Sequence, residues 1–168
     1  MSQRRRAGGR RSTVAGYRRK SGLAVLAVGG IIVPTDRSPI LIQGILKPAI
    51  NSLLSRVRHT NTLVIADRGF PFWPQIETVD ISLVDGVPTV LEVLTAIRGN
   101  FKIGQAIMAR EFIAENSRRT RAQFARALKG IPTEFEPHAE LKQRVPGAIG
   151  LIRTGDTVQY ANLLLVSA

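Results

Sequence analysis

The chain contains no cysteine, only two histidines, and few aromatic residues, which make up 5% of its 168 residues. The absence of cysteine excludes disulfide bonds, thiolate catalysis and cysteine-based zinc sites. It is compatible with a reducing cytoplasm, where we expect the protein to be located. No dinucleotide or P-loop glycine motif follows an apolar segment, and the histidines do not have metal-site spacing. The sequence therefore predicts no metal and no cofactor.

Long apolar runs are also absent, since a membrane span needs about 20 residues. The apolar run over residues 22–34 is shorter than that and follows a segment, residues 1–20, rich in Arg, Gly and Ser. This segment is expected to be disordered in isolation. A basic segment before a short apolar run resembles a secretory signal, although no small-residue cleavage site follows. The alternative interpretation is an adventitious extension, and we expect no membrane association.

The formal net charge of +12 is distributed unevenly. Residues 1–43 contain nine of the 24 Lys and Arg residues and a single acidic residue, Asp36. A basic arm that binds polyanions is one interpretation of this segment. Residues 44–168 are only mildly basic and contain no motif that reads DNA or RNA. We therefore place a domain boundary after residue 43 and expect no nucleic acid as a partner.

Residues 44–168 alternate between helical and extended patterns, which predicts a layered α/β domain. Apolar residues at helical spacing predict helices over residues 47–58, 88–98, 117–128 and 139–144. Apolar or alternating runs predict strands over residues 62–66, 79–84, 103–112, 133–136, 148–153 and 163–166, with a helix as the alternative over residues 103–112. Pro88 is expected near the first position of its helix.

His59 stands at the junction between a predicted helix and the strand over residues 62–66, where loops present side chains to pockets. Histidine titrates closest to neutral pH and is therefore well suited to proton transfer at pH 7. Asp67 follows the same strand and precedes a glycine. Its carboxylate is suited either to hydrogen bonding with sugar-like hydroxyls or to capping the following turn.

Polar residues near the C-terminus form a second group of candidates. His138 follows a proline and either begins the next helix or reaches into a site. Tyr160 and Asn162 open the last strand, and in extended structure they point to the same face. They form either a hydroxyl-binding pair or ordinary sheet-edge contacts. The aromatic loop over residues 69–74 forms either a pocket wall or a contact with the core or a neighbouring subunit.

Taken in order, these motifs resemble the D-ribose pyranase and L-fucose mutarotase family over residues 44–168. The matching stretches are Gly44-Ile45-Leu46, His59-Thr60-Asn61 through Asp67, Gly69-Phe70-Pro71, Asp80-Ile81-Ser82-Leu83 through Gly86-Val87-Pro88, Ile152-Arg153-Thr154-Gly155-Asp156 and Tyr160-Ala161-Asn162. The last triplet favours the ribose-type branch. Asn61, however, stands where ribose-type members typically have an aspartate.

The resemblance implies a three-layer α/β/α fold with a mixed central sheet of about six strands. It also implies a cofactor-free isomerase that interconverts pyranose and furanose forms, or anomers, of a monosaccharide such as D-ribose. By this resemblance, His59 is the catalytic acid or base and no metal takes part. The implied substrate-binding positions are Asp67, His138, Tyr160, Ala161 and Asn162. Family members form ring-like homo-oligomers, commonly decamers.

Ring opening of a cyclic sugar removes a proton from the anomeric hydroxyl and donates one to the ring oxygen. One histidine with a near-neutral pKa is able to carry out both transfers. The alternatives are an L-fucose-type mutarotase and a sugar-binding, transport-associated module that has lost its catalytic rate. A nucleic-acid-associated protein that uses the basic arm ranks last.

Overall fold

The computed structural model describes residues 25–28, 31–34, 44–100 and 102–168, which belong to two units. In the first unit, strands β1 (Val25–Val28) and β2 (Ile31–Pro34) pair antiparallel. The predicted disorder of residues 1–20 lies outside the described residues. The second unit, residues 43–168, contains the remaining described strands and helices.

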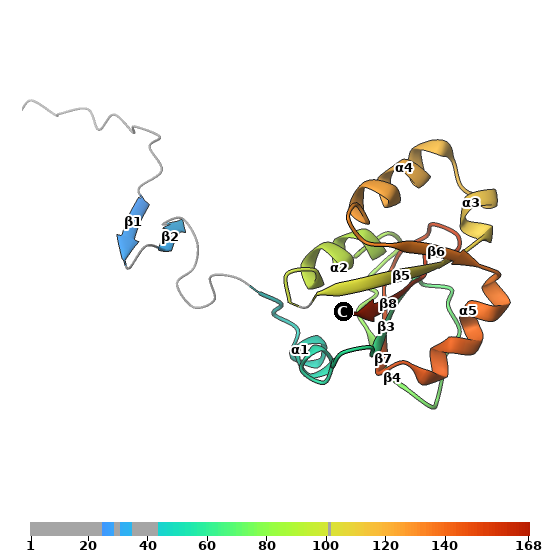
Figure 1. Ribbon diagram of the computed structural model, residues 1–168, viewed down its shortest axis with the longest axis horizontal. Helices are drawn as coiled ribbons and strands as arrows, with labels where there is room; N and C mark the ends of the chain where they lie inside the picture. The colour runs from blue at the N-terminus through green and yellow to red at the C-terminus, as the bar shows by residue number, and fades with distance from the viewer. Residues whose placement is uncertain (1–24, 29–30, 35–43, 101) are drawn as a thin grey trace, which may run out of the picture. The chain divides into compact units, whose positions relative to one another are not determined.

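The second unit is built around a six-stranded sheet in the order β4-β7-β3-β8-β5-β6 (Figure 1). Its strands are β3 (Thr62–Ala66), β4 (Glu77–Asp80), β5 (Ile103–Ala109), β6 (Thr133–Glu136), β7 (Gly150–Arg153) and β8 (Leu163–Ser167). Neighbouring strands are parallel except at β8, which runs antiparallel to both β3 and β5. Five strands therefore end at one edge of the sheet, and β8 begins at that same edge.

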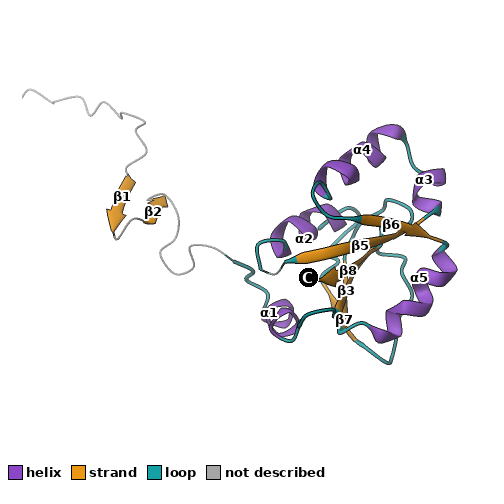
Figure 2. Ribbon diagram, viewed as in Figure 1, coloured by secondary structure: helices purple, strands orange, loops and turns teal. Residues whose placement is uncertain are grey.

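Helices cover both faces of this sheet (Figure 2). They are α1 (Pro48–Ser55), α2 (Val90–Ile97), α3 (Glu111–Glu115), α4 (Arg118–Ala127), α5 (His138–Arg144) and the short 3-10 helix η1 (Val145–Gly147). One core contains residues of α1, α2 and α4, and the other contains residues of α5 and η1. The predicted three-layer α/β/α fold with a mixed six-stranded sheet is confirmed. No helix in the described part of the chain is long and apolar enough to span a membrane.

Alternating side chains along β8 explain why both faces of the sheet are buried. Leu163 and Leu165 pack in the core beneath α1, α2 and α4, whereas Leu164 packs on the opposite face with Leu141 of α5. All four side chains are almost completely buried. A strand that is buried on both faces has a continuous apolar sequence, as β3 and β8 do.

Two predicted strands extend too far. The strand expected over residues 79–84 is β4, which ends at Asp80, because the Asp80 carboxylate accepts the Ser82 N–H at 2.9 Å and turns the chain. The strand expected over residues 103–112 ends at Ala109. The chain then enters α3, whose Phe112 is buried in the core.

Pro88 lies near the start of α2, as expected, but two residues before the first helical position. Thr89 is the N-cap and the helix begins at Val90. The Thr89 hydroxyl accepts the Glu92 N–H, and the Glu92 carboxylate accepts the Thr89 N–H. This reciprocal capping box satisfies two backbone donors and fixes where the helix begins.

Candidate functional site

A cavity of about 400 Å³ lies where the five parallel strands end and β8 begins. This edge is where open α/β sheets typically bind ligands. The cavity volume is within the range of small-molecule sites. Its polar side chains come from the segments after β3, β6 and β7 and before β8, and include Asp67, His138, Asp156, Gln159, Tyr160 and Asn162.

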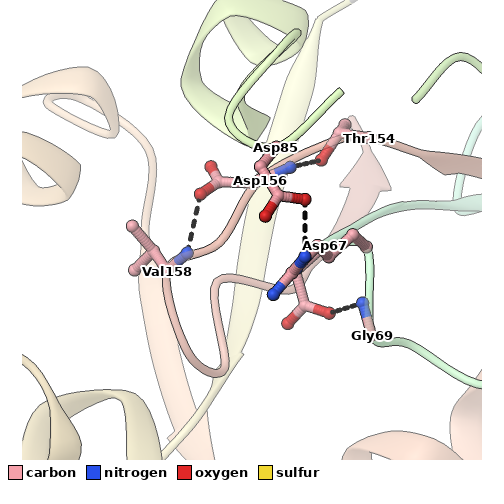
Figure 3. A network of polar contacts seen from close by, with 7 residues as sticks. Asp67, Gly69, Asp85, Thr154, Asp156 and Val158 are labelled. Atoms are coloured by element: carbon pink, nitrogen blue, oxygen red, sulfur yellow. Dashed lines mark hydrogen bonds and ion pairs between the residues drawn. The ribbon is translucent and has the colours of Figure 1, made fainter. Parts of the chain in front are cut away.

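Asp67 is held at the cavity by the turn that follows β3. Its Oδ1 accepts the Gly69 N–H at 2.9 Å (Figure 3), and its own backbone N–H donates to Asn162 Oδ1 at 2.9 Å. Burial raises the pKa of the Asp67 carboxyl above its usual value, although hydrogen bonds from Asn162 and Gly69 oppose this effect. The carboxylate therefore both caps the turn and lines the cavity.

Asp156 organises the loop between β7 and β8 from a position that is only 3% exposed. Its carboxylate oxygens accept the Val90 N–H at the start of α2 and the Val158 N–H, at 2.8 and 2.9 Å. Its own N–H donates to the Thr154 hydroxyl, as Figure 3 shows. Asp156 thus joins α2 to the segment that carries Tyr160. In the sequence, Asp156 belongs to a stretch that matches the family, but it was not assigned this role.

His138 is the first residue of α5 and lies between two aromatic rings. Its ring centroid is 5.0 Å from that of Tyr160, in an edge-on arrangement, and 6.0 Å from that of Phe70. Burial lowers the pKa of His138 below its usual value, and the nearby Lys142 lowers it further. Its buried Nε2 has no hydrogen-bond partner among the described residues. The imidazole is therefore largely neutral at pH 7, and His138 lines the cavity.

Tyr160 and Asn162 both line the cavity, but strand alternation is not the reason. β8 begins only at Leu163, and Tyr160 has a positive φ of 56°, which is uncommon for a residue with a side chain. Asn162 is buried and binds Asp67. Ala161, a predicted substrate-binding position, packs in the core and does not line the cavity.

His59 lies at the opposite edge of the sheet, where its side chain is exposed. The next residue, Thr60, donates its N–H to the carbonyl of Ser167 at the far end of β8. The length of β3 alone separates this edge from the cavity by about 13 Å, at roughly 3.3 Å per residue. Asn61 accepts the Arg58 N–H at 2.8 Å and closes the turn. Within one chain, His59 therefore does not join the cavity residues.

The aromatic loop divides between two environments. Phe70 is buried in the core and also lines the cavity, and Trp73 packs partly against the same core. Phe72, by contrast, is 67% exposed. The loop thus folds back on the core and contributes one ring to the cavity wall.

No cluster of three or more His, Asp or Glu side chains suited to a metal ion is present in the described part of the chain. The cavity offers instead a buried carboxylate, a neutral imidazole, a phenol and a carboxamide. These groups are able to hydrogen-bond several hydroxyls at once and to exchange protons with them.

A mixed six-stranded sheet with a polar cavity at its strand ends defines a small α/β ligand-binding domain. The chain belongs to the RbsD / FucU transport protein family, whose family model matches residues 40–168.

Curated relatives include a D-ribose pyranase of Geobacillus kaustophilus, which is 38% identical over 74% of this chain and 91% of its own length. A D-ribose pyranase of Laribacter hongkongensis is 36% identical over 74% of this chain and 95% of its own length. Bacillus subtilis RbsD complexed with D-ribose has a similar structure, with a TM-score of 0.69 and 28% identity over 75% of this chain and 95% of that one. The fucose mutarotase of Streptococcus pneumoniae, 17% identical over 73% of this chain and 93% of that one, shares the fold with a TM-score of 0.62.

Proposed function

We propose that the protein is a cofactor-free sugar isomerase of the D-ribose pyranase type. It interconverts the pyranose and furanose forms of D-ribose or a related monosaccharide by opening and reclosing the ring. The observation that carries this proposal is the cavity, which brings together four residues from three segments: Asp67, His138, Tyr160 and Asn162. The similarity to enzymes named D-ribose pyranase supports it further.

The cavity groups divide the chemistry between proton transfer and orientation. Because the pKa of His138 is lowered, its neutral imidazole is able to accept the proton of the anomeric hydroxyl at pH 7. A proton donated to the ring oxygen by a second acid, the role proposed for His59, completes the opening of the hemiacetal, and the two groups regain their starting protonation through water. Asp67, Tyr160 and Asn162 bind the remaining hydroxyls and hold the sugar while the free aldehyde rotates.

His59 keeps its proposed role as catalytic acid or base only if a second copy of the chain supplies it. This follows from its exposed position at the sheet edge opposite the cavity. Self-association is supported by three exposed apolar side chains on one turn, Leu83, Val84 and Val87, which are 77%, 61% and 47% exposed. That turn is hydrogen-bonded to Gly155, next to the cavity residue Asp156. We propose a ring-like homo-oligomer, as large as a decamer, in which cavities lie near subunit contacts.

The test is an NMR saturation-transfer measurement of ring-form exchange with D-ribose, other pentoses and L-fucose. The wild type should accelerate exchange of D-ribose, and His138→Ala and Asp67→Asn should each reduce the acceleration by roughly 10²-fold or more. Saturable binding of D-ribose without accelerated exchange would refute the enzyme and indicate a transport-associated binding module. Faster exchange of L-fucose than of D-ribose would indicate the fucose-type mutarotase.

A second experiment tests whether His59 of one copy acts at the cavity of another copy. The variants His59→Ala and His138→Ala are each expected to be inactive when expressed alone. Co-expression should restore exchange, because some sites then combine an intact cavity from one copy with an intact His59 from another. Activity of His59→Ala equal to that of the wild type would remove His59 from the mechanism. Failure of the co-expressed variants to recover would show that no site is shared between copies.

We infer that residues 44–168 carry the activity and that the basic segment, residues 1–43, is not required. The family match over residues 40–168 supports this division. A chain limited to residues 44–168 should retain the exchange rate of the full chain, and neither chain should show salt-dependent DNA binding. The proposed cytoplasmic location is tested by fractionating cells that express the full chain.

A further inference from the structure

Glu111 lies outside every sequence motif discussed above, yet its carboxylate contacts His138 directly. We propose that Glu111 is a positioning residue that acts through His138, by holding the first residue of α5 so that the imidazole faces the cavity. Any effect of Glu111 on the reaction rate rests on the proposed isomerase function. Its effect on the pKa of His138 does not depend on that function.

The sheet topology brings the two residues together. β5 and β6 are parallel neighbours, and Ala109 at the end of β5 is in register with Glu136 at the end of β6. The Arg110 N–H donates to the Glu136 carbonyl at 2.7 Å, which keeps the two strand ends aligned. Glu111 and His138 each follow two residues after this last pair. Their positions just beyond the paired ends of β5 and β6 bring them into contact, although 27 residues separate them in sequence.

The contact replaces a missing helix cap. The N-cap of α5 is Pro137, which has no side-chain group to accept a hydrogen bond. The first N–H groups of a helix have no partner within the helix. Both carboxylate oxygens of Glu111 accept the His138 N–H, at distances of 2.9 and 3.1 Å. A side chain from α3 thus caps α5 at the residue that carries the imidazole.

Fixing this backbone position determines where the imidazole lies. The ring is held between Tyr160 and Phe70, and its buried Nε2 has no partner among the described residues. A shift of the α5 start would move the ring away from these neighbours and change its position at the cavity. Displacements of about 1 Å are able to reduce catalytic rates by roughly 10²-fold.

The charged groups around His138 come from three segments. Lys142 on α5 lowers the pKa of the imidazole, whereas Glu111 on α3 and Asp67 after β3 raise it. Burial is the largest effect and lowers the pKa, so the net direction is downward. Removing the negative charge of Glu111 should therefore lower the pKa of His138 further. The direction of this change separates a positioning role from a general loss of stability.

The test uses NMR titration of the imidazole ring protons in the wild type, Glu111→Gln and Glu111→Ala. The chain has two histidines, so His59→Ala identifies the His138 signals. Glu115→Gln is the matched control, because Glu115 is an exposed carboxylate on the same helix. We expect a lower His138 pKa in both Glu111 variants. Glu115→Gln should leave the His138 pKa as in the wild type.

The exchange assay adds a second readout. Glu111→Gln keeps an oxygen that accepts the His138 N–H, so its maximal rate should stay near that of the wild type while the acidic limb of the pH profile moves to lower pH. Glu111→Ala loses the hydrogen bond as well, and its maximal rate should fall roughly 10- to 100-fold. If Glu111→Ala does not fold, the His138 pKa of Glu111→Gln alone tests the proposal. An unchanged His138 pKa in Glu111→Gln would overturn the proposal. A wild type without exchange activity would refute only the proposed function.

Discussion

Replacement of Asp156 tests whether the loop that carries Tyr160 depends on one buried carboxylate. In Asp156→Ala, the Val90 and Val158 N–H groups lose their acceptors in a buried setting. A hydrogen bond to a charged group contributes about 1.5–3 kcal/mol, so the free energy of unfolding should fall by about 3–6 kcal/mol. Asp156→Asn keeps one acceptor oxygen and places an amide donor against the other N–H. It should lose about 1.5–3 kcal/mol.

The assay is urea unfolding at a fixed protein concentration, because self-association would make apparent stability depend on concentration. Asp85→Asn is a matched control: Asp85 lies nearby (Figure 3), but its side chain is 70% exposed and, among the described residues, forms an ion pair only with Arg68. An exposed ion pair of this kind contributes about 0–1 kcal/mol. If Asp156→Asn unfolds at the same urea concentration as Asp85→Asn, the network does not have the role assigned to it here.

Two further predictions concern the same edge of the sheet. Gly155→Ala should cost about 1–3 kcal/mol or more, because a Cβ at this position would lie 2.3 Å from the Val84 carbonyl oxygen. Thermal unfolding checks this prediction, with Gly147→Ala as the control because a Cβ at Gly147 would meet no atom within 4 Å. Asp67→Asn should be more stable than the wild type at neutral pH yet less active, because the raised pKa of Asp67 makes ionisation unfavourable to folding. The stability difference should shrink as pH falls through the raised pKa and should vanish below about 3.8, so unfolding measured across this range is the check.

Local patterns were sufficient for elements whose burial is uniform along the chain. β3 (Thr62–Ala66) and β6 (Thr133–Glu136) have the predicted bounds, because a turn or helix signal stands on each side of them. Glu111 was not identified from the sequence because the small and apolar residues before it continue into α3, so the pattern does not mark where β5 ends. The role of Asp156 was also hidden from a local pattern, since its acceptor contact with Val90 spans 66 residues.

Strand direction accounts for the remaining difference between the predicted and observed sites. Asp67, His138 and Asp156 all follow parallel strands of the six-stranded sheet, and Tyr160 and Asn162 precede β8, which runs antiparallel to its neighbours, so all five reach the same edge. His59 precedes a parallel strand and by the same rule belongs to the opposite edge. Sequence motifs indicate which residues take part but contain no information on strand direction. The proposed function therefore requires His59 and Asp67, eight residues apart across one strand, to act at two edges of two different copies, with each copy giving its cavity to one site and its histidine to another.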